Sequence, residues 1–195
     1  MRKVYFFDFD GTLTTKDTMF MFLRHCDQNR FAAKFLLHIP VFMLLKFKLA
    51  KAEKVKRHFI ASVLKGKSEV FLKEKAQSFF KENYPDLIRE NALEFIHNMD
   101  RQQTESYLVT ASLDLWVKPF ADKFNMILIS TEAKFKDGIF TGKFKGANCN
   151  GEEKVRRIKE VLGDKKFDKS IAFGDTSGDD ALLKYANEGH YKFFH

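Results

Sequence analysis

The chain has 195 residues, of which 45% are hydrophobic, and this is enough apolar material for one packed domain with a small insertion. No uncharged apolar run reaches the roughly 18 residues of a membrane-spanning helix, and the first residues lack the apolar core of a signal peptide, so we expect a cytoplasmic protein. The net charge of +8 is concentrated in residues 30–81, which hold 13 Lys and Arg but only three acids.

This basic segment has two interpretations. It is typical of a protein with an anionic partner, such as a phosphate, a nucleic acid or a membrane surface, but lysines on solvated helix faces explain it equally well. The two cysteines, Cys26 and Cys149, are far apart and have no zinc-site spacing. We therefore expect two reduced thiols and neither a disulfide framework nor a zinc site.

The first predicted element is a buried strand, Val4 to Phe9, a short aromatic-rich run that ends at the turn residues Asp-Gly-Thr. From about Asp17 to Asn98 the pattern becomes helical. In the segment EKVKRHFIASVLKGK, for example, apolar residues recur at intervals of three and four. The members of this apolar set are Val55, Phe59, Ile60, Val63 and Leu64.

From Glu105 onward, strands and helices alternate. The expected elements are a strand in ESYLVTAS, a helix in LDLWVKPFADKF, a strand in MILIST, a hairpin in KFKDGIFTGKFKG, a helix in GEEKVRRIKEVLG and a strand in KSIAFGD. This alternation is typical of a parallel sheet with crossover helices. The sequence thus predicts an α/β fold interrupted by a helical insertion.

Polar and small residues follow three of these strands, and in open α/β sheets the ligand site forms where the carboxyl ends of strands meet. The residues at these ends are Asp8, Asp10, Gly11 and Thr12; Thr110, Ala111 and Ser112; and Gly174, Asp175 and Asp179. Asp8 and Asp10 point to the same side of an extended chain, while Phe9 points into the core.

Crowded carboxylates repel one another, and a hard cation is the usual remedy. Mg²⁺ prefers oxygen ligands and keeps positions for water and substrate phosphate, which fits Asp8, Asp175 and the backbone carbonyl of Asp10. Asp8 can then attack phosphorus while Asp10 protonates the leaving oxygen. Thr110 and Lys154 are candidates for the hydroxyl and the cation that phosphoryl transfer also needs.

Four segments of the chain, DFDGTLT, YLVTAS, GEEKVRRI and FGDTSGDDALL, resemble in order and spacing the four motifs of the haloacid dehalogenase-like phosphohydrolases. The resemblance covers the whole chain. It implies a Rossmann-like parallel sheet with helices on both faces, formed by residues 1–14 and 100–195, and an all-helical cap formed by residues 15–99. Such a cap between the first two motifs is found in the subfamily that contains phosphoserine phosphatase.

The same resemblance implies roles for individual residues. Asp8 would be the nucleophile, Asp10 the general acid and base, and Thr110 and Lys154 phosphate ligands. Asp8, Asp175 and the carbonyl of Asp10 would bind Mg²⁺, with Asp179 supporting the metal site from behind or through a water. The further residues expected at the substrate are Gly11, Thr12, Ala111, Ser112 and Asp17, the last standing where phosphoserine phosphatases have a substrate-binding glutamate.

Within this family, DGTLTTKDTMFMFL, VTASLDLWVKPFA and TGKFKGANCNGEEKVRRI are most similar to the bacterial phosphatidylglycerophosphatase C and CicA group. The likeness implies a lipid phosphomonoester as substrate, with a small soluble ester such as phosphoserine as the alternative. In Phe31 to Lys51, an apolar run is flanked by Lys34, Lys46, Lys48 and Lys51. It could lie on an anionic membrane at the inner face or pack inside the cap.

Two other classes of function compete with a phosphatase. A nucleic-acid-binding module would use the basic segment, but the sequence contains no motif that reads DNA or RNA, so we expect no specific nucleic acid partner. A catalytically silent protein that binds a membrane or a partner would leave the acidic set without a purpose. The sequence does not indicate an oligomeric state.

Overall fold

The structure is a computed structural model that describes the backbone of residues 1–46 and 52–195 and the side chains of residues 1–44 and 52–195. Its centre is a six-stranded sheet with the order β4-β3-β2-β1-β5-β6, in which every neighbouring pair is parallel except β3 and β4. The strands are β1 (Lys3–Phe7), β2 (Thr104–Leu113), β3 (Ile127–Lys136), β4 (Ile139–Lys145), β5 (Lys169–Gly174) and β6 (Glu188–Tyr191).

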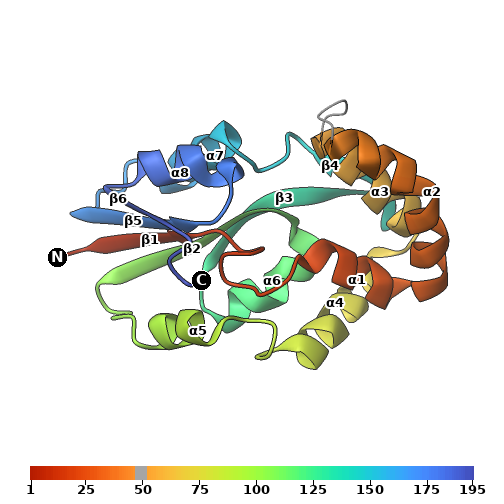
Figure 1. Cartoon of the computed structure of the whole chain (residues 1–195). Coiled ribbons are helices and arrows are strands. Elements are labelled where there is room, and N and C mark those ends of the chain that lie inside the picture. Colours follow the sequence, from red (N-terminus) through yellow and green to blue (C-terminus); the bar gives the residue numbers. More distant parts are fainter. Residues whose placement is uncertain (47–51) are drawn as a thin grey trace.

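Helices cover both faces of this sheet. In Figure 1, α7 (Glu152–Leu162) and α8 (Asp180–Tyr185) lie over one face, and α5 (Glu90–His97) and α6 (Asp114–Lys123) lie over the other. Five described helices are inserted between β1 and β2: α5 and, at one end of the molecule, α1 (Thr18–Cys26), α2 (Gln28–Lys46), α3 (Ala52–Leu64) and α4 (Glu69–Asn83). The predicted α/β fold with a helical insertion is therefore confirmed.

β1 is buried from both sides, which explains why its sequence is almost continuously apolar. Phe6 packs with Tyr107 in the core beneath α7 and α8, whereas Phe7 belongs to the core on the opposite face. The Phe7 ring stacks on Phe173 of β5 at a centroid distance of 5.0 Å. Aromatic packing of this kind uses several of the chain's 23 phenylalanines and joins the neighbouring strands β1 and β5 through their side chains.

The inserted helices do not all pack against the same partner. α5 lies on the sheet, where Phe95 contacts Tyr5 and Phe173 at centroid distances of 5.7 and 5.3 Å. α4 instead packs on α6, and α3 packs on α2 and β4. The apolar set predicted for α3 is confirmed, because all five of its side chains are buried. The division into a cap of residues 15–99 and a core stays a prediction.

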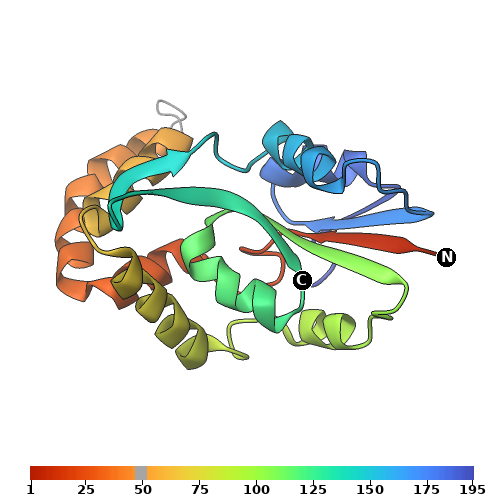
Figure 2. The same cartoon turned by 180° about the vertical axis from the view of Figure 1, so that it is seen from behind.

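The predicted strand MILIST and the predicted hairpin share one long strand. β3 pairs with β2 through its first half and with β4 through its second half. Asp137 and Gly138 form the two-residue turn and have φ of 51° and 73°, the left-handed backbone that tight hairpin turns require. Figure 2 shows from behind how this hairpin extends from the sheet to the inserted helices. None of the described helices is both long and apolar enough to cross a bilayer.

Candidate active site

Asp8 and Asp175 follow the neighbouring strands β1 and β5, and a glycine turn brings their carboxylates together. The backbone N–H of Asp8 donates to the Phe173 carbonyl at 3.0 Å, so Asp8 continues the register of the sheet. The chain then turns at Gly11, where φ is +83° and a Cβ atom would lie only 2.4 Å from Oδ2 of Asp175. Glycine is thus required here on both conformational and steric grounds.

Lys154 forms a buried ion-pair network with two of the acids. Its Nζ lies 2.6 Å from Oδ1 of Asp8 and 2.6 Å from Oδ1 of Asp179, and it also donates to the Val109 carbonyl at 2.9 Å. The three acceptors match the three N–H donors of an ammonium group, which is the condition under which such a charge tolerates burial. α7 carries this lysine in its first turn, beside the ends of the strands.

Burial is the largest single influence on the pKa values of Asp8, Lys154 and Asp179. Desolvation raises the pKa of Asp8 to about 7, although the neighbouring Lys154 opposes the shift. Burial also disfavours the charged form of Lys154, but the two carboxylates overcome this and raise its pKa. The pKa of Asp179 is lowered because Lys154 and the hydrogen bonds from Thr176 outweigh its desolvation. The lysine therefore stays protonated, and Asp8 is the group of this network that titrates near neutral pH.

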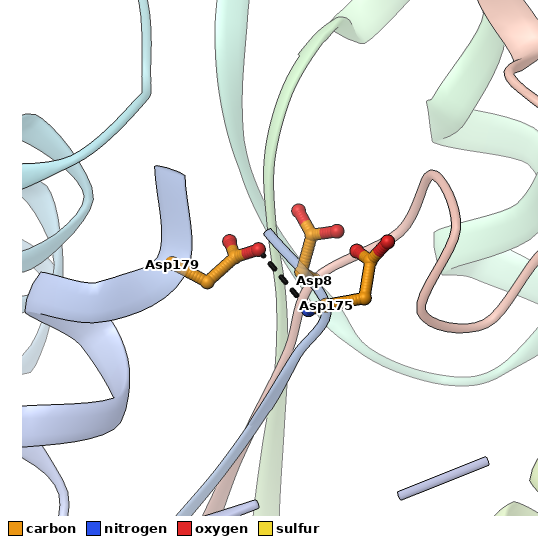
Figure 3. A group of neighbouring side chains, drawn as sticks. All are labelled: Asp8, Asp175 and Asp179. Carbon is orange, nitrogen blue, oxygen red and sulfur yellow. Dashed lines mark hydrogen bonds between the residues drawn. The ribbon is translucent and has the colours of Figure 1, made fainter. Parts of the chain in front are cut away.

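Asp8, Asp175 and Asp179 form the candidate metal site. Each offers a carboxylate oxygen, and these oxygens all lie within 4.8 Å of one another (Figure 3). The Thr12 hydroxyl lies 3.2 Å from Oδ2 of Asp8 and 3.0 Å from Oδ1 of Asp175, but its single proton can serve only one of them. Two facing carboxylates that share one donor fit a hard divalent cation such as Mg²⁺.

Asp179 differs from the other two acids because both of its oxygens already accept hydrogen bonds. Oδ1 accepts from Lys154, while Oδ2 accepts from the Thr176 hydroxyl and from the backbone N–H groups of Asp175 and Thr176. Its side chain thereby holds the lysine and shapes the loop after β5. This geometry is consistent with the supporting role predicted for it. The neighbouring Asp180 is an exposed first residue of α8.

Asp10 lies outside this acidic cluster and is held by the helical insertion. Its Oδ1 accepts from the backbone N–H and the hydroxyl of Thr18 at 2.7 and 2.6 Å, and its Oδ2 accepts from the Ser112 hydroxyl. Trp116 in turn donates to the Thr18 hydroxyl at 2.9 Å. The sequence does not predict Thr18 and Trp116 as residues of the site, since nothing in the spacing indicates that the start of α1 meets α6 at this carboxylate.

Thr110, Ala111 and Ser112, predicted to follow a strand, lie within the last residues of β2, where its pairing with β3 shifts register between Thr110 and Leu113. Thr110 is buried, and its hydroxyl oxygen accepts from the Ser112 N–H at 3.1 Å, while the Ala111 carbonyl accepts from Thr131. Asp17 caps the N-terminus of α1 by accepting from the Met19 N–H at 2.9 Å. Their predicted contacts with a substrate stay predictions.

A cavity of about 450 Å³ opens between the inserted helices and this end of the sheet. Met19, Phe20, Phe42 and Val55 give it an apolar wall on the side of the insertion. Its polar lining consists of Glu53, Lys56, Asn148, Asn150 and the backbone at Ala111. Ala111, the residue after Thr110, thus lines a pocket that could hold the organic part of a substrate.

Comparison with known proteins agrees with this geometry. Residues 5–184 match the family model described as haloacid dehalogenase-like hydrolase. The protein CicA of Caulobacter vibrioides is 35% identical over 191 residues, which are 96% of this chain and 85% of CicA.

Two solved structures share the fold. A protein with unknown function from Bordetella pertussis Tohama I superposes with a TM-score of 0.83 at 22% identity, covering 95% of this chain and 87% of that one. A phosphoserine phosphohydrolase-like protein from Francisella tularensis gives a TM-score of 0.68 at 22% identity, covering 98% and 86%. At this level of identity the likeness concerns the fold alone.

Proposed function

The chain belongs to the haloacid dehalogenase-like hydrolase family, and we propose that it is a phosphomonoesterase that works through an aspartyl-phosphate on Asp8 with Mg²⁺ as its cofactor. The observation that carries this proposal is the position of Asp8. Its carboxylate is buried between the ammonium group of Lys154 and the facing carboxylate of Asp175, at the carboxyl end of the sheet. A bound Mg²⁺ would neutralise Asp8 and Asp175 and draw a phosphate toward them.

The chemistry divides between the two acids that follow β1. A carboxylate oxygen of Asp8 attacks phosphorus, a new P–O bond forms, and the bond from phosphorus to the ester oxygen breaks. Asp10 gives its proton to the departing alcohol and then takes a proton from the water that hydrolyses the acyl phosphate. Its hydrogen bonds to Thr18 and Ser112 fix the orientation of this acid. The ammonium group of Lys154 compensates negative charge at Asp8 during both steps.

The first experiment measures phosphate release by the wild type and by Asp8→Asn, with Mg²⁺ and with EDTA. The substitution removes the nucleophile at nearly constant volume, so we expect a folded protein without turnover. Acid quenching of the wild type during turnover of a ³²P-labelled ester should trap labelled protein, and Asp8→Asn should trap none. Mg²⁺-dependent turnover by Asp8→Asn would overturn the mechanism.

For the substrate we propose a lipid phosphate, because α2, which lines the pocket through Phe42, also carries an exposed apolar face. On α2, Leu36 and Leu37 are 66% and 68% exposed, and Met43 and Leu44 lie on the same side at helical spacing with 50% and 43% exposed. Phe42, one residue before Met43, lines the cavity. An acyl chain held at the exposed face would thus bind to the same helix that lines the pocket.

The same face supports the proposal that the protein contacts an anionic membrane. Residues 30–81 carry a local charge of +10, from 13 basic and three acidic residues, and Lys34 lies on α2 itself. Exposed leucines with nearby cations are what a peripheral helix presents to anionic lipid. The predicted flanking lysines Lys46, Lys48 and Lys51 lie outside the residues whose side chains the structure describes.

The substrate is tested by comparing phosphate release from phosphatidylglycerophosphate in mixed micelles with release from phosphoserine and other soluble esters. A kcat/KM at least tenfold higher for the lipid supports the proposal. Preference for a soluble ester would overturn the lipid assignment and leave the phosphomonoesterase intact. Activity on no ester would favour a silent binding protein.

A further inference from the structure

Lys56 of α3 is a half-buried cation that reaches from the helical insertion toward the catalytic end of the sheet. Its Nζ lies 3.4 Å from the Ala111 carbonyl, which is long for a hydrogen bond, and it forms no ion pair with any described residue. Lys154, by contrast, has three close acceptors. Lys56 therefore retains donor capacity, and no described carboxylate lies within ion-pair distance of it.

The neighbouring acids do not supply the missing partner. Glu53, one turn earlier on α3, is paired with Arg57. Asp17 is near enough for the charge of Lys56 to act on it, but it accepts the Met19 N–H as the cap of α1 and forms no ion pair among the described residues. The pocket is thus left with an ammonium group at its polar end, close to Ala111 and next to the predicted phosphate ligand Thr110.

Asn148 adds a second donor from the segment that follows β4. Its Oδ1 accepts from the Thr131 hydroxyl at 3.0 Å, an orientation that turns its amide NH₂ away from that bond. No acceptor for this NH₂ group occurs among the described residues, and Asn148 lines the same cavity as Lys56. An ammonium and an amide donor that converge on one pocket are suited to an anion.

We propose that Lys56, assisted by Asn148, binds a second anionic group of the substrate, separate from the phosphate that Asp8 attacks. Lys154 is saturated by Asp8 and Asp179, so it is Lys56 that has a charge to offer to the rest of the substrate. The second group is a phosphodiester or a carboxylate a few atoms from the ester oxygen. This inference rests on the proposed function and makes Lys56 a specificity residue of that site.

The test uses matched esters that differ in the second anion. Glycerate 3-phosphate carries a carboxylate where glycerol 3-phosphate carries a hydroxymethyl group, and phosphatidylglycerophosphate carries a phosphodiester that phosphatidic acid lacks. We expect Lys56→Gln to raise KM about 10- to 100-fold for the preferred doubly anionic ester, as expected for the loss of a charged hydrogen bond. KM for its singly anionic partner should change less than about twofold, and kcat should change little for both.

Two variants control this experiment. Lys56→Arg keeps the cation and should retain most of the discrimination. Lys54→Gln removes an equal charge from an exposed position of the same helix and should leave every KM unchanged. A rise in KM confined to glycerate 3-phosphate would identify the second anion as a carboxylate. A rise confined to phosphatidylglycerophosphate would identify it as a phosphodiester.

The outcomes separate this inference from the proposed function. If Lys56→Gln weakens both members of each pair equally, Lys56 serves the scissile phosphate or the fold, and the inference is wrong. A wild type that hydrolyses all four esters without preferring a second anion also overturns it, while the phosphomonoesterase stands. A wild type with no Mg²⁺-dependent activity on any ester overturns the proposed function itself.

Discussion

Lys154 Nζ and Asp8 Oδ1 lie 2.6 Å apart, and their side chains are only 1% and 9% exposed. The pair joins α7 to the end of β1, so the helix that follows the hairpin supplies the counter-charge for the proposed nucleophile. Because Asp179 completes the network from the loop after β5, three separate parts of the chain meet at one ammonium group. The stability of the core and the chemistry of the site are therefore coupled.

Lys154→Met tests this coupling. The variant leaves two buried carboxylates without their cation, and removing one partner of a buried ion pair typically costs about 3–5 kcal/mol in the free energy of unfolding. We expect a loss of this size in urea denaturation, together with loss of turnover. Lys159→Met, at an exposed position of the same helix, should change stability by about 0.5 kcal/mol or less.

A double variant separates charge from packing. Lys154→Met with Asp179→Asn removes one of the two uncompensated carboxylates, so it should regain part of the lost stability without regaining activity. If Lys154→Met unfolds at the same urea concentration as the wild type, the network does not contribute as the geometry indicates.

Gly11→Ala should inactivate the site through a collision with Asp175. Both Gly11 and Gly138 have positive φ, +83° and +73°, but a Cβ on Gly138 would meet nothing within 4 Å. Each alanine should therefore cost about 1 kcal/mol in unfolding free energy for its backbone conformation. Only Gly11→Ala should also lose Mg²⁺-dependent phosphate release, by at least about tenfold. Equal activity of the two variants would show that the approach of Gly11 to Asp175 is not needed.

The sequence predicts the strands and the acids that follow them, because β1 and β5 are short apolar runs and their carboxyl ends must meet. It places Ser112 of β2 at the same edge as Asp10 but does not predict Thr18 as a partner of Asp10, since Thr18 approaches it only after the insertion folds back on the sheet. It also leaves α2 ambiguous, because an apolar helix has the same composition whether it is covered or exposed. In the structure Phe31 packs on Phe59, whereas the side chain of Leu37 is exposed to solvent.

The pKa of Asp8 predicts how pH and Mg²⁺ act together. Burial raises this pKa from 3.8 to about 7, so folded protein without metal holds a proton that the unfolded chain releases from about pH 4 upward. The free energy of unfolding should therefore fall as pH rises from about 4 to 7 and change little from Asp8 above that range. Mg²⁺ binds the ionised carboxylate, so its stabilising effect should grow over the same interval.

Urea denaturation at pH 5, 6, 7 and 8, with and without Mg²⁺, measures both effects. Asp8→Asn has no proton to exchange at this position, so its stability should lack this component of the pH dependence and respond less to Mg²⁺. A Mg²⁺ effect of equal size at pH 5 and pH 8 would contradict the role of Asp8 as a metal ligand.

The exposed face of α2 predicts binding to anionic vesicles that depends on apolar side chains as well as on charge. Leu36→Gln with Leu37→Gln keeps the helix and its lysines but removes two leucines that could each bury apolar surface in the lipid. At about 1 kcal/mol or more for each partly inserted leucine, vesicle affinity should fall about tenfold or more.

Val70→Gln on α4 is the matched control, because Val70 is also 66% exposed but lies on a different helix. Flotation with phosphatidylglycerol vesicles measures binding, and hydrolysis of a soluble ester should be unchanged in both variants. Equal flotation of the α2 variant and the wild type would mean that α2 does not meet the membrane, and lipid turnover would then need another route to the pocket.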